Sequence, residues 1–154
     1  MTTYELDKFV GLDISKIGIS ETEMQFVTRD GQKIYLSVYG DCCSYSYFYD
    51  FYGVWNLIGN GPILSVEEVD LLPSDPGYHL EDNAGYVQIY GIRFTTKHQL
   101  WGPVSSTISF RNESNGYYGG WAEVSNTSPN KFVNIDSDCV DIPRFLDGRT
   151  DWEK

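Results

Sequence analysis

The fold is decided by residues 24–39, which read MQFVTRDGQKIYLSVY. From Lys33 to Tyr39, aliphatic side chains alternate with tyrosine and serine, as side chains do on the two faces of a half-buried strand. The Asp30-Gly31 pair between the two apolar runs favours a tight reversal with positive φ. We therefore predict a β-hairpin whose strands cover residues 24–28 and 33–39.

Other alternating segments predict further strands. They cover residues 63–72, 86–96 and 104–112, and Gly91 is expected to form a β-bulge because the alternation changes phase there. Residues 121–125 are expected to pair with 104–112 in a second hairpin, across Asn115-Gly116-Tyr117-Tyr118-Gly119-Gly120. Residues 73–85 are rich in Pro, Asp and Gly, which predicts an exposed loop.

One helix is predicted over residues 45–58. Its apolar side chains recur at steps of three and four residues: Tyr47, Phe48, Phe51, Val54, Trp55 and Ile58. The expected fold class is α+β, predominantly antiparallel β-sheet with one helix after the Cys-Cys element. The 154 residues fit a single domain, 1–154, in which residues 1–10 and 143–154 are expected to be mobile.

Charge excludes several classes of partner. Acidic residues outnumber basic ones by 22 to 11, for a formal net charge of −11, which disfavours direct binding to nucleic acid or to an anionic membrane. No apolar run approaches the roughly 20 residues of a spanning helix, and the first ten residues lack the layout of a signal peptide. The three cysteines do not form the pattern of a secreted disulfide scaffold. We expect a cytosolic protein with free thiols.

Asp41-Cys42-Cys43-Ser44 is the most unusual local feature. At the start of a helix, the backbone amides would lower the pKa of a thiol and make it reactive. The interpretation we favour is structural: one cysteine packs inward as a small apolar residue, and Asp41 or Ser44 caps the helix. Adjacent cysteines lack the spacer of a zinc site, so no metal is expected, and no motif points to a cofactor.

A second concentration of small, polar and aromatic residues runs from Arg111 to Trp121, as on binding surfaces. The candidate binding residues are Arg111, Asn112, Asn115, Tyr117, Tyr118 and Trp121. The alternative interpretation is a hairpin whose glycines meet backbone demands and whose tyrosines cover the sheet.

These two elements together, Gly40-Asp41-Cys42-Cys43-Ser44 and later Arg111 to Gly120, resemble a family of small uncharacterised proteins of bacteriophages and bacteria. The resemblance covers roughly residues 25–124 and transfers no activity. It implies a viral or prophage origin and, by analogy, a protein that binds a host protein, including one of a defence system. A charge of −11 suits an approach to a basic, nucleic-acid-handling surface.

Three hypotheses of function follow. The leading one is a non-catalytic binding protein without catalytic residues, which engages a host protein in the host cytoplasm through the 115–121 hairpin or through its acidic surface. The second is a binder of a nucleotide-like small molecule, in which Arg111 contacts the anion. The third is a thiol enzyme that uses Cys42 or Cys43. The oligomeric state stays open in all three.

Overall fold

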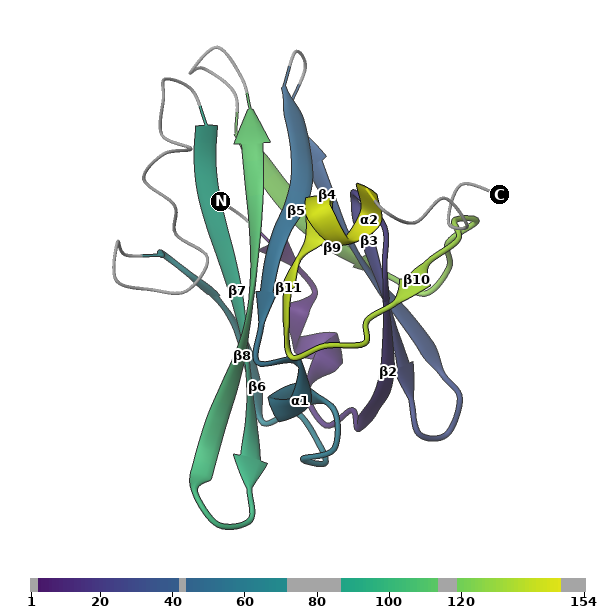
Figure 1. Cartoon of the computed structure of the whole chain (residues 1–154), viewed down its shortest axis with the longest axis vertical. Helices are drawn as coiled ribbons and strands as arrows, with labels where there is room; N and C mark the ends of the chain where they lie inside the picture. The colour runs from purple at the N-terminus through teal and green to yellow at the C-terminus, as the bar shows by residue number, and fades with distance from the viewer. Residues whose placement is uncertain (1–2, 42–43, 72–86, 114–118, 148–154) are drawn as a thin grey trace.

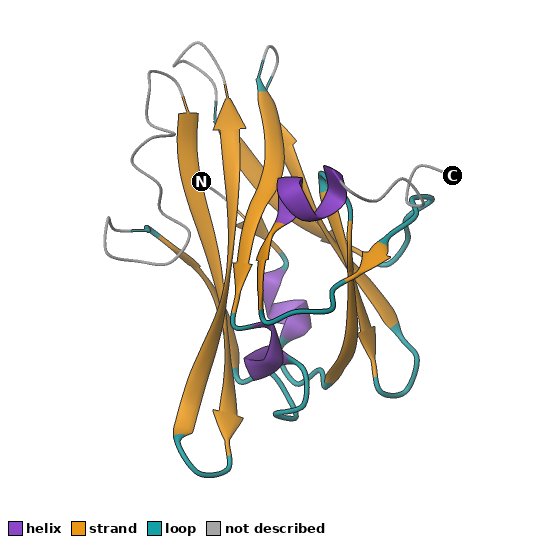
Figure 2. Ribbon diagram, viewed as in Figure 1, coloured by secondary structure: helices purple, strands orange, loops and turns teal. Residues whose placement is uncertain are grey.

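Two β-sheets face each other as the layers of a sandwich in the computed structural model of the chain (Figure 1). The structure describes residues 3–41, 44–71, 87–113 and 119–147. Short helices lie at the ends and edges of the sandwich (Figure 2). The described part of the chain is therefore built mainly from antiparallel strands, as its alternating sequence predicts.

The first sheet has six strands, and all of its neighbours are antiparallel except β1 and β9. Its order is β1 (Thr3–Tyr4), β9 (Gly120–Ser125), β4 (Lys33–Gly40), β3 (Glu23–Thr28), β2 (Ile14–Ile19) and β10 (Val133–Asn134). The hairpin predicted from residues 24–39 is confirmed, because β3 and β4 pair with Phe26 opposite Ile34.

The second sheet has five strands, all antiparallel to their neighbours. Its order is β11 (Cys139–Asp141), β5 (Tyr45–Tyr52), β8 (Gly102–Glu113), β7 (Val87–His98) and β6 (Ser65–Val69). The longest pairing joins β7 to β8 from Val87 opposite Glu113 to His98 opposite Gly102. These two strands form a long hairpin that extends past α1 at the lower edge of Figure 1.

Aromatic rings from both sheets fill the core. Phe9 belongs to the short helix η1 (Leu6–Phe9) and packs edge-on against Phe26 of one sheet and Phe94 of the other, with ring centroids 5.0 and 5.3 Å apart. All three side chains are buried. Each buried side chain of this size stabilises the fold by roughly 1.5–3 kcal/mol, so η1 closes the space between the sheets.

The prediction of a helix over residues 45–58 is wrong for most of this segment. Tyr45–Tyr52 forms strand β5, and only Val54–Leu57 forms the four-residue helix α1. A β-bulge between Phe48 and Asp50 places one extra residue in the strand, so that Phe48 and Phe51 both reach the core although they are three residues apart. The bulge thus imitates helical spacing within a strand. A second short helix, α2 (Ile142–Asp147), lies near the C-terminus.

The second predicted hairpin is also wrong. Strands β8 and β9 lie in different sheets: β8 pairs with β5 and β7, and β9 pairs with β1 and β4. The strand that forms a hairpin with β8 is the preceding strand β7, and a short turn at residues 99–101 joins the two. Alternation identifies a strand but not its neighbour, because every half-buried strand presents the same pattern.

Gly91 does not form a bulge, because the register of β7 and β8 is continuous through it. The apolar residues change face there: Ile89 pairs opposite Arg111 on the outer face, whereas Ile92 pairs opposite Ile108, which is in the core. A Cβ on Gly91 would lie 2.9 Å from Cγ2 of Val69 and 3.0 Å from Cγ of Leu71. Because glycine has no side chain, Val69 and Leu71 can pack closely against the backbone of Gly91 on the outer face of the sheet.

Candidate functional site

The two elements singled out in the sequence meet in space, because Gly40 of β4 pairs with Gly120 of β9. The Asp41 N–H also donates a hydrogen bond to the carbonyl of Gly119, at 3.2 Å. A Cβ on Gly120 would lie 2.5 Å from Oγ of Ser46, and one on Gly40 would lie 2.5 Å from Oγ of Ser44. Two glycines are therefore required for the close approach of one sheet to the other at this end of the sandwich.

Asn112 joins the sheets at the same point. Its side chain is fully buried, and its Nδ2 donates to Oγ of Ser46 at 2.9 Å and to Oγ of Ser44 at 3.2 Å. Ser46 Oγ then donates to the carbonyl of Tyr39 on β4 at 2.7 Å. These hydrogen bonds of the buried Asn112 and Ser46 side chains order the sheets relative to each other, so the structure gives Asn112 a packing role.

Asp41 and Ser44 form a turn rather than a helix cap. The Ser44 N–H donates to the Asp41 carbonyl at 3.0 Å, and Ser44 Oγ donates to the same oxygen at 2.7 Å. The predicted capping role is wrong, because a strand and not a helix begins at Tyr45. Cys42 and Cys43 lie outside the described residues, so the hypothesis of a reactive thiol stays a prediction.

We expect Gly120→Ala to lower the free energy of unfolding by about 1–3 kcal/mol. The new methyl group would meet Ser46 Oγ and the Tyr39 carbonyl, which lies 3.0 Å away, and this overpacking exceeds the gain from a less flexible unfolded chain. Urea unfolding measures the difference. Glu123→Ala, at an exposed position of the same strand, is the control and should change stability by less than about 0.5 kcal/mol. Equal stability of the two variants would contradict the close packing of Gly120 against Ser46 and Tyr39.

Arg111 lies on the opposite face of β8 from Asn112, as neighbouring residues of a strand must. Its side chain is 0% exposed, and its guanidinium carbon lies 4.2 Å from the ring centroid of Tyr49. Tyr49 therefore covers the charge through a cation–π contact. In this arrangement the guanidinium does not face solvent, so binding an anionic ligand would require Tyr49 to move.

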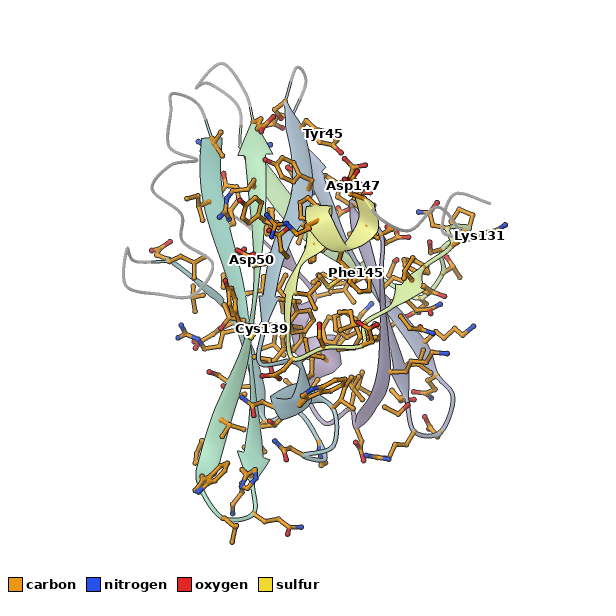
Figure 3. The ribbon with its side chains drawn as sticks, viewed as in Figure 1. Tyr45, Asp50, Lys131, Cys139, Phe145 and Asp147 are labelled. Atoms are coloured by element: carbon orange, nitrogen blue, oxygen red, sulfur yellow. The ribbon has the colours of Figure 1, made fainter. Side chains whose placement is uncertain are left out.

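A buried carboxylate shares this outer face. Asp50 is 3% exposed and pairs opposite Ser109, whose hydroxyl donates to Oδ2 of Asp50 at 3.4 Å. Figure 3 shows Tyr45 near the upper end of β5, with Asp50 and Cys139 further down the same sheet. The outer face of the second sheet thus holds an embedded polar cluster of Arg111, Asp50 and Ser109 beneath an aromatic cover.

This cluster affects Tyr52, which pairs opposite Thr107 and Cys139. Burial raises the pKa of the Tyr52 phenol above its usual 10.0, the negative charges of Asp50, Cys139 and Asp141 raise it further, and Arg111 partly offsets them. The folded state therefore favours the protonated phenol. Its contribution to stability is complete below about pH 10 and is lost as the pH rises through the raised pKa.

We accordingly expect Tyr52→Phe to flatten the loss of stability at alkaline pH. Between about pH 9 and 11, the urea midpoint of the wild-type protein should fall more steeply than that of the variant, because phenylalanine cannot ionise. The same pair of proteins compared at pH 7 gives the baseline difference. Parallel curves over the whole alkaline range would show that Tyr52 does not titrate differently in the folded protein.

Of the remaining predicted binding residues, the structure describes only Trp121. Trp121 is half-buried and stacks on Tyr39, with ring centroids 5.9 Å apart and planes inclined by 27°. Asn115, Tyr117 and Tyr118 lie outside the described residues. The structure therefore does not bring the described candidates Arg111, Asn112 and Trp121 together in one site: they lie on the outer face of one sheet, between the sheets, and on the other sheet.

A feature that sequence reasoning missed is the turn between β7 and β8. Leu100 and Trp101 are 82% and 76% exposed there, more than any other large apolar residue of the described chain. The His98 ring stacks on Trp101 with centroids 4.3 Å apart, and its Nδ1 accepts the N–H groups of Leu100 at 3.1 Å and Trp101 at 3.3 Å. The signal was present in the sequence: Leu-Trp occupies a turn where Gly, Asn and Asp are usual.

These observations define an antiparallel β-sandwich protein with an ordered aromatic tip on its longest hairpin. The chain belongs to the family described as "Domain of unknown function (DUF7448)", which it matches over residues 7–124. The match starts before residue 25, where the resemblance in the sequence was expected to start. It includes Gly40, Asn112 and Gly120, the residues that bring the two sheets together.

A relative with its own sequence match is an uncharacterised protein of Acanthamoeba polyphaga mimivirus. It is 32% identical over 124 residues, which cover 75% of this chain and 89% of the relative. No solved structure matches the chain. Among the described residues, no helix is long and apolar enough to cross a membrane. Within the same residues, no group of three or more His, Cys, Asp and Glu side chains is placed to hold a metal ion.

Proposed function

We propose that this protein is a non-catalytic binding protein that recognises another protein through the tip of the β7–β8 hairpin. The observation that carries the proposal is the exposure of Leu100 and Trp101, at 82% and 76%. Both residues belong to the turn that joins β7 to β8, and the end of this hairpin projects beyond the rest of the sandwich (Figure 2). Exposed apolar side chains gathered at one point mark interaction sites, and tryptophan is enriched among residues that dominate binding energy.

The tip is also held in one conformation, which favours tight binding. The stack of His98 on Trp101 and the two N–H···Nδ1 hydrogen bonds fix the turn before any partner arrives. A side chain that is already ordered loses less conformational entropy on association. A rigid aromatic anchor of this kind suits insertion into a preformed pocket of a folded partner.

The partner we propose is a protein of the host cell cytoplasm, with a viral origin for this chain. The relative from mimivirus supports such an origin. The net charge of −11 favours a partner with a basic surface, because complementary potentials speed encounter. Proteins that bind nucleic acid, including those of defence systems, present positively charged surfaces to the phosphates.

The experiment is affinity capture from host lysate with wild-type protein, Trp101→Ala and Trp55→Ala, quantified by mass spectrometry. Trp55 is the matched control, because it is also an exposed tryptophan (47%) but belongs to α1 and not to the β7–β8 turn. We expect one protein to be enriched by wild type and Trp55→Ala and lost with Trp101→Ala. Equal capture by all three proteins would reject the tip as the binding surface.

A further inference from the structure

A second site lies at the other end of β8 from the Leu100–Trp101 turn. A pocket of about 370 Å³ opens there between β5, the end of β8 and α2, within the size range of small-ligand sites. Its lining combines carboxylates, tyrosines and apolar side chains: Glu21, Tyr45, Tyr47, Phe48, Glu113, Ile142, Pro143 and Leu146.

The inner part of the pocket is apolar. Phe48, Ile142 and Leu146 are buried members of the hydrophobic core that also line the pocket. Two tyrosine rings, Tyr45 and Tyr47, are stacked along β5, with centroids 5.5 Å apart and planes inclined by 25°. A hydrocarbon chain of a few methylene groups would gain about 0.8 kcal/mol for each group removed from water. The apolar part of the pocket therefore favours a ligand with an alkyl chain.

The polar part of the pocket is negative. The hydroxyl of Tyr47 donates to Oε1 of Glu113 at 2.9 Å, and the hydroxyl of Tyr45 donates to Oε1 of Glu21. Each phenol thus fixes one carboxylate while using only one of its roughly four acceptor positions. The Phe48 N–H also donates to the carbonyl of Glu21 at 2.9 Å, which ties that residue to β5.

Neither of these carboxylates forms an ion pair with a basic side chain of the described chain. Lys8 pairs with Glu5 and Arg29 pairs with Asp13, whereas the basic residue nearest to Glu113 along β8 is Arg111, which is covered by Tyr49. An anionic ligand would be repelled, and a neutral ligand would leave the carboxylates without a counter-charge. A cation would be attracted by both carboxylates and by the faces of the tyrosine rings.

We propose that this pocket binds a primary alkylammonium group: the ammonium lies between Glu21 and Glu113, and the methylene chain packs on Phe48 and the tyrosine rings. An ammonium suits two separate carboxylates, because it is a compact charge with three rotatable donors. The same chemistry is present in a free aliphatic amine and in a lysine side chain of a protein. This site is independent of the hairpin tip, and its test does not depend on the tip's partner.

The test is an NMR titration of ¹⁵N-labelled protein with n-pentylamine, and with 1-pentanol and pentanoate as neutral and anionic probes of the same length. We expect saturable shifts confined to β5, Glu113 and α2 with the amine alone, weakened by added salt. Equal shifts with pentanol, or shifts spread over the whole surface without saturation, would overturn the proposal.

Variants of the two glutamates test whether their negative charges bind the ammonium group. Glu21→Gln and Glu113→Gln should each weaken amine binding by about 3- to 5-fold, as expected for partly exposed charges, and the double variant by about 10-fold or more. Glu67→Gln, at an exposed glutamate of β6, is the matched control and should bind as wild type does. Unchanged NMR spectra outside the pocket show that each variant protein is folded. Undiminished binding by the double variant would also overturn the proposal.

Two further titrations distinguish the sources of the amine. The first uses 1,5-diaminopentane, and the second uses a short peptide with one central lysine and its acetyl-lysine counterpart. Tighter binding of the lysine peptide than of the free amines identifies a protein side chain as the ligand, whereas tighter binding of the diamine identifies a small metabolite. Equal binding of the lysine and acetyl-lysine peptides would show that the ammonium is not recognised.

Discussion

Replacing Arg111 by alanine is expected to lower the free energy of unfolding by about 3–5 kcal/mol. Arg111 is among the largest fully buried side chains of the described chain, so its truncation leaves a cavity beneath Tyr49. It also removes a positive charge from the face that holds Asp50, which is 3% exposed. A buried carboxylate that loses a nearby positive charge is costly to keep ionised.

Two variants separate these contributions. Arg111→Met keeps most of the volume, so the part of the loss that it still shows comes from the charge. Arg93→Ala is the matched control, because Arg93 lies on the same face of the sheet opposite Thr107 but is only half-buried. We expect it to cost less than about 1 kcal/mol in urea unfolding. An Arg111→Ala variant as stable as Arg93→Ala would contradict the embedded cluster.

Replacing Trp101 by alanine is expected to have the opposite profile: almost no effect on stability and a large effect on binding. The side chain is 76% exposed, so its loss should change the free energy of unfolding by less than about 0.5 kcal/mol. If Trp101 is the anchor of the interface, its truncation costs at least about 2 kcal/mol, or roughly 30-fold in Kd. Titration calorimetry with the purified partner measures this change.

The neighbouring residues refine this prediction. Leu100→Ala should weaken binding less than Trp101→Ala, because leucine is seldom a dominant anchor. His98→Ala removes the stacked ring and the acceptor of two N–H groups, so it should weaken binding through the loss of a fixed turn. Trp55→Ala should bind as wild type does. A fall in affinity for Trp55→Ala equal to that for Trp101→Ala would place the interface elsewhere.

Local patterns predicted the strands better than they predicted the partners of those strands. The β3–β4 hairpin follows from alternation and from Asp30-Gly31, because both signals lie within one short segment. The strand order does not, since β8 and β9 are placed in different sheets by long-range packing. The strand β5 was mistaken for a helix because a bulge at its centre puts Phe48 and Phe51 on one face.

The candidate site was predictable only in part. Once residues 104–112 are read as a strand, Arg111 and Asn112 must point to opposite faces, so a common site for them was already inconsistent with that strand. The meeting of Gly40 with Gly120 depends on strand order and could not be predicted from either segment alone. Leu100 and Trp101 lie in the turn between two predicted strands, and their degree of exposure follows from how far this hairpin extends, which local patterns do not predict.

The most direct test of the proposed binding function is site-specific photo-crosslinking in host cells. A photoreactive amino acid is placed at position 101 and, as the control, at position 30, which lies at the polar turn of the β3–β4 hairpin. We predict that position 101 yields one dominant crosslinked host protein that position 30 does not yield. The same crosslinked species from both positions, or a dominant species from position 30 alone, would contradict the assignment of the β7–β8 tip as the binding surface.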